Sequence, residues 1–166
     1  CADYLNKNHF GGYFSDWDLW RMATSAAARS VGAHDWLGSL QAGFAGDVTI
    51  FDGREHQDFR AILDATPKEV RLVLRSGVPL YGDSTLMSVL PGAETCEEIP
   101  DGVCTEPRRI CVTRESGGKT LAQLTAANVA SYGLFFCGVP DNEPTCQPLR
   151  SQPVAYGPLP VPDVDG

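Results

Sequence analysis

Three histidines are the residues of this chain best suited to bind a metal ion or to act as a general base. His9, His34 and His56 lie far apart, and none belongs to an H-x-H or H-E-x-x-H pattern. His56 lies two residues before Asp58, in a segment that we expect to be an exposed loop. No C-x-x-C pair is present, although a structural zinc site normally contains one. We therefore predict no metal ligand in this chain.

The cysteines could be nucleophiles or disulfide partners, and their surroundings favour disulfides. A cysteine nucleophile needs a lowered thiol pKa and a nearby base, but residues 57–166 contain no histidine. Acidic neighbours such as Glu97 and Glu106 would raise a thiol pKa instead. No G-x-S-x-G nucleophile motif occurs either. We therefore predict no catalytic residue in this chain.

The cysteine spacings are those of small, covalently closed loops. C-x₇-C, C-x₆-C and C-x₈-C all occur in the second half of the chain. Each disulfide stabilises such a segment by about 2–4 kcal/mol and forms in an oxidising compartment. Five cysteines cannot all pair among themselves, so the fifth must pair with Cys1 or with another chain. The disulfide candidates are Cys1, Cys96, Cys104, Cys111, Cys137 and Cys146.

One segment resembles a phosphate-binding loop but lacks its essential glycine. Residues 116–120 (SGGKT) lie between an expected strand and an expected helix. The P-loop motif requires a glycine where this chain has Thr113, and Glu115 places a negative charge where phosphates would lie. A Gly-Gly turn followed by Thr120 as a helix N-cap explains the same residues without a ligand. Nucleotide binding is therefore a distant hypothesis.

Charge and length exclude several classes of protein. The 166 residues include 13 basic and 21 acidic side chains, which gives a net charge of −8. A nucleic-acid-binding protein usually carries a basic patch, and Arg108-Arg109 is the densest basic spot here. No stretch approaches the roughly 20 apolar residues that a transmembrane helix needs. The chain is also too short for a complete (β/α)₈ barrel, which takes about 250 residues.

The first residue is a cysteine rather than a methionine, and no signal peptide is recognisable. We therefore expect either a processed protein or a piece of a longer one. A lipid anchor on Cys1, as in bacterial lipoproteins, is a minor alternative. It is disfavoured because apolar residues, rather than a polar tether, follow Cys1.

The clearest expected helix lies between Ser15 and Gly32. Ser15 and Asp18 form a variant of the capping box at its start, and Gly32 supplies a left-handed stop at its end. Apolar residues recur at spacings of three and four, which predicts one apolar stripe. The stripe consists of Trp17, Trp20, Ala23, Ala27 and Val31.

Alternating apolar residues predict a β-hairpin further along the chain. Ser76-Gly77 is the expected turn. Pro79 marks the return strand as an edge of the sheet, because proline cannot donate a ladder hydrogen bond. The expected elements of this region are a strand at 47–51, helical turns at 58–65, a strand at 70–75 and its return strand at 78–81.

The second half is less regular. We expect a strand at 109–114, a helix at 120–130 and a short strand at 134–137. Five prolines follow Cys146, a composition that favours extended polyproline II structure over a packed element.

Four segments between Leu19 and Gly82 follow one another in a familiar pattern. Residues 19–32 have the form "L..aT.n.Ar.lG", residues 38–43 the form "GsLe.Gk", residues 45–52 the form "ADlvvld" and residues 70–82 the form "v..Vi.nG.vvyg". Together they resemble the C-terminal end of the metal-dependent amidohydrolase superfamily, over a little under half of the chain. Phe44 and Gly46 depart from the usual Lys or Arg and Ala, which affects packing rather than chemistry.

The resemblance implies a fold. Members of the superfamily are (β/α)₈ barrels with a small β-sandwich built from both chain ends. The expected fold class is therefore an α+β fragment: the last helix of the barrel, the C-terminal strands of the sandwich, and an irregular disulfide-stapled extension. The expected parts are terminal barrel helices at 1–35, sandwich strands and a hairpin at 36–82, a Cys-rich extension at 83–150 and a Pro-rich tail at 151–166.

The resemblance also implies a chemistry, which is metal-assisted hydrolysis of C–N bonds in amides or cyclic amides. Members use one or two divalent metals, with zinc expected here, to lower the pKa of bound water. Their metal ligands precede the final helix, whereas Asp3, Asp16 and Asp18 fall after the place of the last ligand. We therefore expect this chain to be structural, inactive alone and without a metal of its own.

The partners that the resemblance implies are the remainder of the parent barrel and sandwich. Without them, the face carrying Val70, Leu72 and Leu74 should be exposed. The parent would act on a small molecule and belong to a secreted or periplasmic subgroup; no nucleic acid is involved, and a homo-oligomer remains open.

A non-catalytic protein is the competing hypothesis. Here a secreted, disulfide-stapled binding module would have reused the C-terminal sandwich of a hydrolase. Residues 152–164, which are rich in proline, would then be a linker or a ligand segment.

Overall fold

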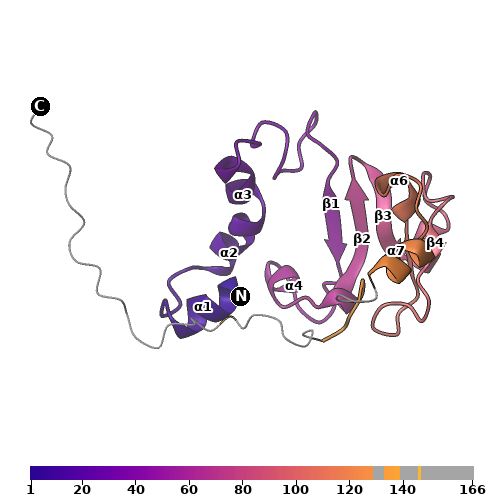
Figure 1. Cartoon of the computed structure of the whole chain (residues 1–166). Coiled ribbons are helices and arrows are strands. Elements are labelled where there is room, and N and C mark those ends of the chain that lie inside the picture. Colours follow the sequence, from indigo (N-terminus) through magenta and orange to yellow (C-terminus); the bar gives the residue numbers. More distant parts are fainter. Residues whose placement is uncertain (129–132, 139–145, 147–166) are drawn as a thin grey trace, which may run out of the picture.

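The computed structural model describes residues 1–128, 133–138 and 146, which form an α+β fold around a small antiparallel sheet (Figure 1). The strand order is β1-β2-β3-β5-β4. The strands are β1 (Val48–Phe51), β2 (Val70–Arg75), β3 (Val78–Asp83), β4 (Glu97–Glu98) and β5 (Arg108–Ile110). The helices are α1 (Ala2–Asn8), α2 (Asp16–Ala23), α3 (Ser25–Ser30), α4 (Arg60–Leu63), α5 (Ser84–Met87), α6 (Val112–Glu115) and α7 (Leu121–Ala127), with a 3₁₀ turn η1 at Pro67–Glu69.

The long helix expected between Ser15 and Gly32 is divided at Thr24 into α2 and α3. The capping box forms as predicted, because the Ser15 hydroxyl accepts from the backbone N–H of Asp18 and the Asp18 carboxylate accepts from that of Ser15. At the break, the Thr24 hydroxyl donates to the carbonyl of Trp20, at 3.0 Å. Such bonds from threonine one turn back bend helices, and Thr24 has a non-helical backbone, with φ −128° and ψ −105°. The prediction of one continuous helix is therefore wrong.

The hairpin of β2 and β3 turns at Ser76-Gly77, as predicted, and both residues have a positive φ. The prediction that Pro79 lies in an edge strand is wrong, because β3 is flanked by β2 and β5. The proline is tolerated for two reasons. The register between β2 and β3 shifts near Pro79, and β5 pairs only with residues 81–83 of β3.

The extension after Gly82 covers both faces of the hairpin. On one face, Leu72 packs with residues of the extension in a buried cluster, whose other members are Met87, Ala93, Cys96 and Cys111. On the other face, Tyr81 packs against a second cluster made of Ile99, Val103, Val112 and Leu121. The prediction of an exposed face is therefore wrong at Leu72, which is 5 % exposed, and at the partly buried Leu74.

The remaining expectations of the second half are met in part. The strand expected at 109–114 is the short β5, because the backbone turns at Cys111 into α6. The helix expected at 120–130 is α7, capped by Thr120 and Gln123. The strand expected at 134–137 is absent from the described residues 133–138. The Pro-rich tail at 151–166 lies outside the described residues.

Residues 1–128 fall into two structural parts, which we call the helix lobe (residues 1–45) and the sheet lobe (residues 46–128). The boundary follows the hydrogen bonds: the amide of Ala45 donates to Trp36, whereas the carbonyl of Gly46 accepts from Gly77 in the hairpin. Figure 1 shows α3 joined to β1 by an arched connection, with α4 between α2 and the sheet. Both hydrophobic clusters belong to the sheet lobe and its disulfide-linked extension.

Candidate functional site

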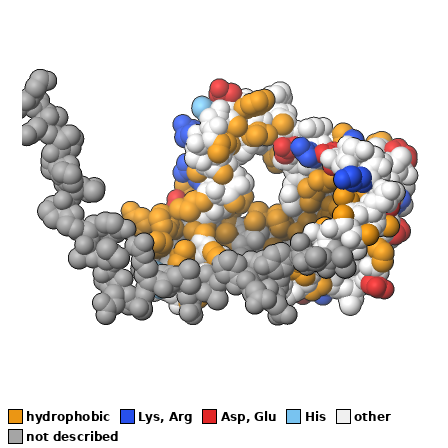
Figure 2. Space-filling view, viewed as in Figure 1, with side chains coloured by type: hydrophobic (Ala, Val, Ile, Leu, Met, Phe, Trp, Pro, Cys, Tyr) orange, Lys and Arg blue, Asp and Glu red, His pale blue; other side chains and the backbone are white. Residues whose placement is uncertain are grey.

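Several large apolar side chains of the helix lobe are exposed in the described structure. Trp17 is 47 % exposed, Trp36 60 % and Tyr13 81 %. The buried residues of this lobe are few: Asn6, Leu19, Ala28 and Ala33. Figure 2 shows a hollow between the helices and the sheet, with hydrophobic side chains along its border. Contiguous exposed apolar patches commonly mark interaction sites, which makes this surface a candidate for one.

The edge of the sheet beside this hollow is also uncovered. β1 pairs with β2 on one side and has no described strand on the other. Ile50, which pairs with the buried Leu72, is 47 % exposed. An edge strand presents unpaired backbone groups to any chain that approaches. The helix lobe and β1 therefore form one candidate interface.

The helix lobe is attached to the sheet lobe through α4. The Trp20 ring lies 5.3 Å from that of Phe59. The Arg60 guanidinium donates to Asp16 and to Asp3, the latter at 3.0 Å. These hydrogen bonds hold the pKa of both carboxyl groups below its usual value of 3.8. Arg60 of the sheet lobe thus pairs with two carboxylates of the helix lobe, those of Asp3 and Asp16.

The attachment should weaken in acid. Because Arg60 lowers the folded-state pKa of Asp3 and Asp16, the stabilisation is complete above about pH 3.8 and is lost as the pH falls through the folded values. We expect Trp20 fluorescence, measured with Trp17 and Trp36 replaced by Phe, to change below pH 3.8. Arg60→Met should remove most of this transition.

Arg54→Met is the matched control, since Arg54 pairs with Asp52 inside the sheet lobe. This variant should keep the acid transition of the wild type. An identical titration of wild type and Arg60→Met would show that Arg60 does not hold the lobes together.

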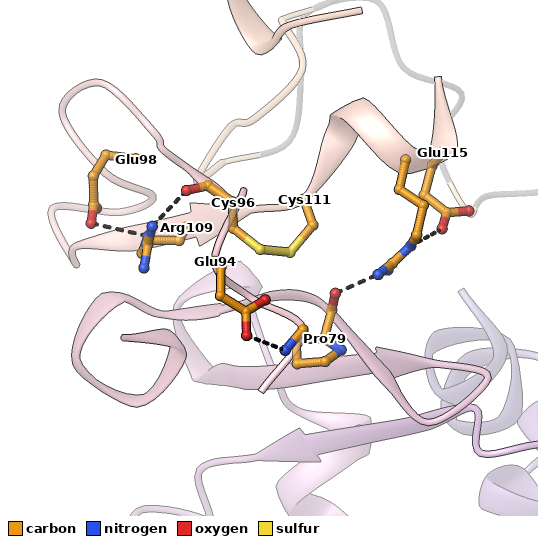
Figure 3. The surroundings of a disulfide bond; sticks show 9 residues. Pro79, Glu94, Cys96, Glu98, Arg109, Cys111 and Glu115 are labelled. Carbon is orange, nitrogen blue, oxygen red and sulfur yellow. Dashed lines mark hydrogen bonds and ion pairs between the residues drawn. A yellow bond between two sulfur atoms is a disulfide. The ribbon is translucent and has the colours of Figure 1, made fainter. Parts of the chain in front are cut away.

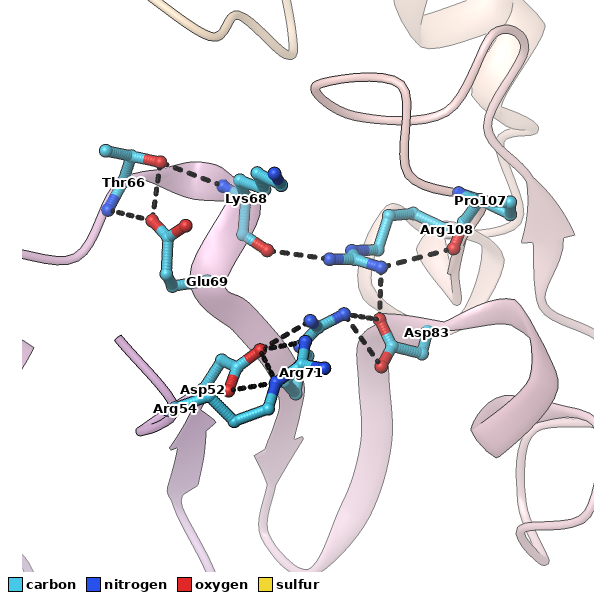
Figure 4. A network of polar contacts seen from close by, with 9 residues as sticks. All are labelled: Asp52, Arg54, Thr66, Lys68, Glu69, Arg71, Asp83, Pro107 and Arg108. Carbon is cyan, nitrogen blue, oxygen red and sulfur yellow. Dashed lines mark hydrogen bonds and ion pairs between the residues drawn. The ribbon is translucent and has the colours of Figure 1, made fainter. Parts of the chain in front are cut away.

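A chain of alternating charges crosses one end of the sheet (Figure 4). Asp52 accepts from Arg54 and from Arg71, at 2.5 and 2.6 Å. Asp83 accepts from Arg71, at 3.4 Å, and from Arg108. These bonds hold the pKa of Asp52 well below its usual range. Because Arg71, Asp83 and Arg108 belong to β2, β3 and β5, the chain of charges fastens the extension to the hairpin.

Arg108 is the most deeply buried of these charged residues, with a side chain only 1 % exposed. Its guanidinium also donates to the carbonyl of Lys68, at 2.8 Å. Its Nε is buried and has no hydrogen-bond partner among the residues that the structure describes. A buried cation is tolerated only where it is paired, so Asp83 is the group on which Arg108 depends.

A small pocket of about 250 Å³ lies beside the Cys96–Cys111 disulfide, between the segment 87–94 and Arg109. Figure 3 shows how its charged groups are engaged. Arg109 donates to the carbonyl of Cys96, at 2.6 Å, and its Nε lies 3.3 Å from Glu98. Glu94 accepts from the amide of Gly92, which lowers its pKa. The charged groups of the pocket are thus occupied within the chain.

The histidines of the described part of the chain do not converge. His34 lies 3.6 Å from Asp35, and His56 lies 4.0 Å from Asp64. Within the described residues, no group of three or more His, Cys, Asp or Glu could hold a metal ion. Asp3, Asp16 and Asp18 are engaged by Arg60 or by the capping box.

Residues 116–120, which resemble a phosphate-binding loop, form a Gly-Gly turn followed by an N-cap at Thr120. Gly117 and Gly118 both have a positive φ. The Ser116 hydroxyl donates to the carbonyl of Lys119, and Thr120 caps α7 through Gln123. The turn and the cap account for these residues without a ligand.

All six cysteines are paired in three disulfides: Cys1–Cys146, Cys96–Cys111 and Cys104–Cys137. Cys1 is thus the partner of Cys146, the cysteine of the second half that has no partner within that half. Sequence spacing could not supply this pairing. Nor could it reveal Arg60, Asp83 and Arg108 as central residues, since the partners that join them to other elements lie 12 to 57 positions away; the local signal was the Arg108-Arg109 doublet.

No helix of the described residues is long and apolar enough to cross a membrane. Comparison with family models, with curated proteins and with solved structures finds no match to this chain. The resemblance to the amidohydrolase superfamily therefore rests on the four sequence segments between Leu19 and Gly82 alone.

Proposed function

We propose that this chain is the C-terminal part of a metal-dependent hydrolase that acts on amide or cyclic amide C–N bonds. The observation that carries the proposal is the uncovered apolar surface of the helix lobe, including Trp17 and Trp36. In the parent enzyme this surface covers the (β/α)₈ barrel, and β1 borders further strands of the sandwich. The order of the four family-like segments supports the same arrangement.

The role of this chain in the proposed enzyme is structural. The described residues do not fit the catalytic metal, since they offer no group of three ligands. The metal, with zinc as the expected ion, and the small-molecule substrate belong to the part of the enzyme encoded before the helix lobe. When bound there, the metal supplies hydroxide near neutral pH. The helix lobe contributes surface that excludes water from the outside of the barrel.

The natural protein, purified from its source, provides the test. Its intact mass and N-terminal sequence should show a longer chain that carries an Asp at a strand end before residue 1, where barrel enzymes place catalytic groups. Metal analysis should give stoichiometric zinc, and a panel of amides and cyclic amides should include a substrate. A natural protein without divalent metal or such activity contradicts the proposal.

One observation favours the second candidate, a secreted non-catalytic binding module. The extension seals the Leu72 face of the hairpin and is fastened to it by Arg108. Residues 46–137 therefore bury hydrophobic clusters without help from another domain. This candidate predicts a natural protein without metal. Three disulfides suit secretion under either proposal.

A further inference from the structure

The disulfides Cys1–Cys146 and Cys104–Cys137 each include an exposed cysteine, whereas Cys96–Cys111 is buried. Cys96 and Cys111 are 4 % and 3 % exposed and lie inside the cluster around Leu72. Cys1 is exposed, and Cys146 is half-buried. Thiol–disulfide exchange requires a thiolate to reach a sulfur atom. A reductant can therefore attack Cys1–Cys146 in the folded protein, whereas Cys96–Cys111 is shielded.

The Cys1–Cys146 disulfide also joins the two lobes. Cys1 is the residue before α1 in the helix lobe. Cys146 follows Cys137 by nine positions, and Cys137 is bonded to Cys104 in the extension. The covalent path from the extension thus ends at the first turn of α1.

Within the described residues, the first helix has few other contacts that hold it. α1 has seven residues, and helices shorter than about 12 residues are marginal in water. Its contacts in the described part of the chain include the ion pair of Asp3 with Arg60, the paired hydrogen bonds between the Asn6 side chain and the backbone of Phe14, and a hydrogen bond from the Gly12 amide to the Asn6 carbonyl. Asp3 and Arg60 are 22 % and 27 % exposed, so solvent screens part of this ion pair.

From these observations we infer that Cys1–Cys146 is a redox-sensitive clasp, which a dithiol reductant opens while Cys96–Cys111 stays closed, and whose opening loosens α1 from the sheet lobe. A thiolate of the dithiol attacks the sulfur of the exposed residue Cys1, and Cys146 leaves as a thiolate that takes a proton from water. The second thiol of the reagent then displaces Cys1 and closes a cyclic disulfide. The reagent loses two electrons, and the clasp gains them as two thiols.

The test combines graded reduction with hydrogen exchange on the full chain. After treatment with increasing dithiothreitol and alkylation, peptide mapping should find Cys1 and Cys146 modified at concentrations that leave Cys96 and Cys111 paired. At that point amide exchange in α1 should be at least tenfold faster, while exchange in β2 and β3 stays unchanged. Simultaneous reduction of the buried disulfide, or unchanged exchange in α1, would overturn the inference.

A double variant separates the clasp from other effects of reductant. Cys1→Ser with Cys146→Ser should show fast exchange in α1 without reductant and no further change in α1 when dithiothreitol is added. Amide exchange in the sheet lobe of this variant should equal that of the wild type, which would show that the variant has folded. If α1 of the double variant exchanges like the wild type, the disulfide is not a clasp. None of these outcomes depends on whether the parent protein is a hydrolase.

Discussion

Replacing Asp83 by asparagine should lower the free energy of unfolding by about 3 kcal/mol. The substitution keeps the shape of the side chain but removes the negative charge that faces Arg108. The Arg108 guanidinium is 1 % exposed, so water cannot replace the lost partner. Breaking a buried ion pair in this way costs about 3–5 kcal/mol, because it leaves an uncompensated buried charge. Urea unfolding followed by circular dichroism measures the effect.

Glu98→Gln is the matched control for this prediction. It also removes a carboxylate that faces an arginine, but Glu98 is 64 % exposed, so the change should cost less than about 1 kcal/mol. Adding Arg108→Met to Asp83→Asn should restore part of the lost stability, because no unpaired charge then remains. A cost for Asp83→Asn no larger than that of Glu98→Gln would show that the buried pair is unimportant.

Replacing both Cys96 and Cys111 by alanine should cost at least about 3 kcal/mol. The disulfide closes a loop with a sequence separation of 15 residues, for which the loss of chain entropy in the unfolded state predicts about 3 kcal/mol. Both residues lie in the cluster with Leu72, Met87 and Ala93, so lost packing adds to the effect. Urea unfolding under oxidising conditions is the measurement.

Val89→Ala provides the comparison for the disulfide variant. Val89 follows Met87 in the same region but is 76 % exposed. Surface substitutions usually change stability by less than about 0.5 kcal/mol, and we expect that result here. A double cysteine variant that loses less than 1 kcal/mol would mean that the extension holds its place on the hairpin without the disulfide.

The sequence predicted the features that local chemistry determines. Ser15 and Asp18 are three residues apart, so the capping box needs no information from the rest of the fold. The turn at Ser76-Gly77 follows from the two positive φ values that a tight hairpin requires. Thr120 as an N-cap is likewise local.

The features that the sequence did not predict depend on distant contacts. The cover over Leu72 comes from Met87, Ala93 and the Cys96–Cys111 pair, and no periodicity in the hairpin reveals it. The break at Thr24 arises from a hydroxyl that bonds to Trp20 where a helical pattern continues.

The candidate interface was predicted in part. Sequence patterns placed an apolar stripe on the helix that contains Trp17. They also placed the exposed surface on the wrong element, the Leu72 face of the hairpin. The hairpin face is covered because the extension packs its own apolar residues against the sheet. The described residues of these clusters do not pack against the helix lobe, so its apolar side chains stay exposed.

The most direct test of the central claim is hydrogen exchange of α2 and α3 in two samples, the intact natural protein and the isolated chain of 166 residues. If a preceding barrel covers the helix lobe, peptides spanning residues 16–30 should exchange at least tenfold more slowly in the natural protein. Peptides of β3 should exchange at equal rates in both samples and serve as the internal reference. Equal exchange of α2 and α3 in the two samples would mean that no preceding domain covers the helix lobe, and the account of this chain as part of a hydrolase would be wrong.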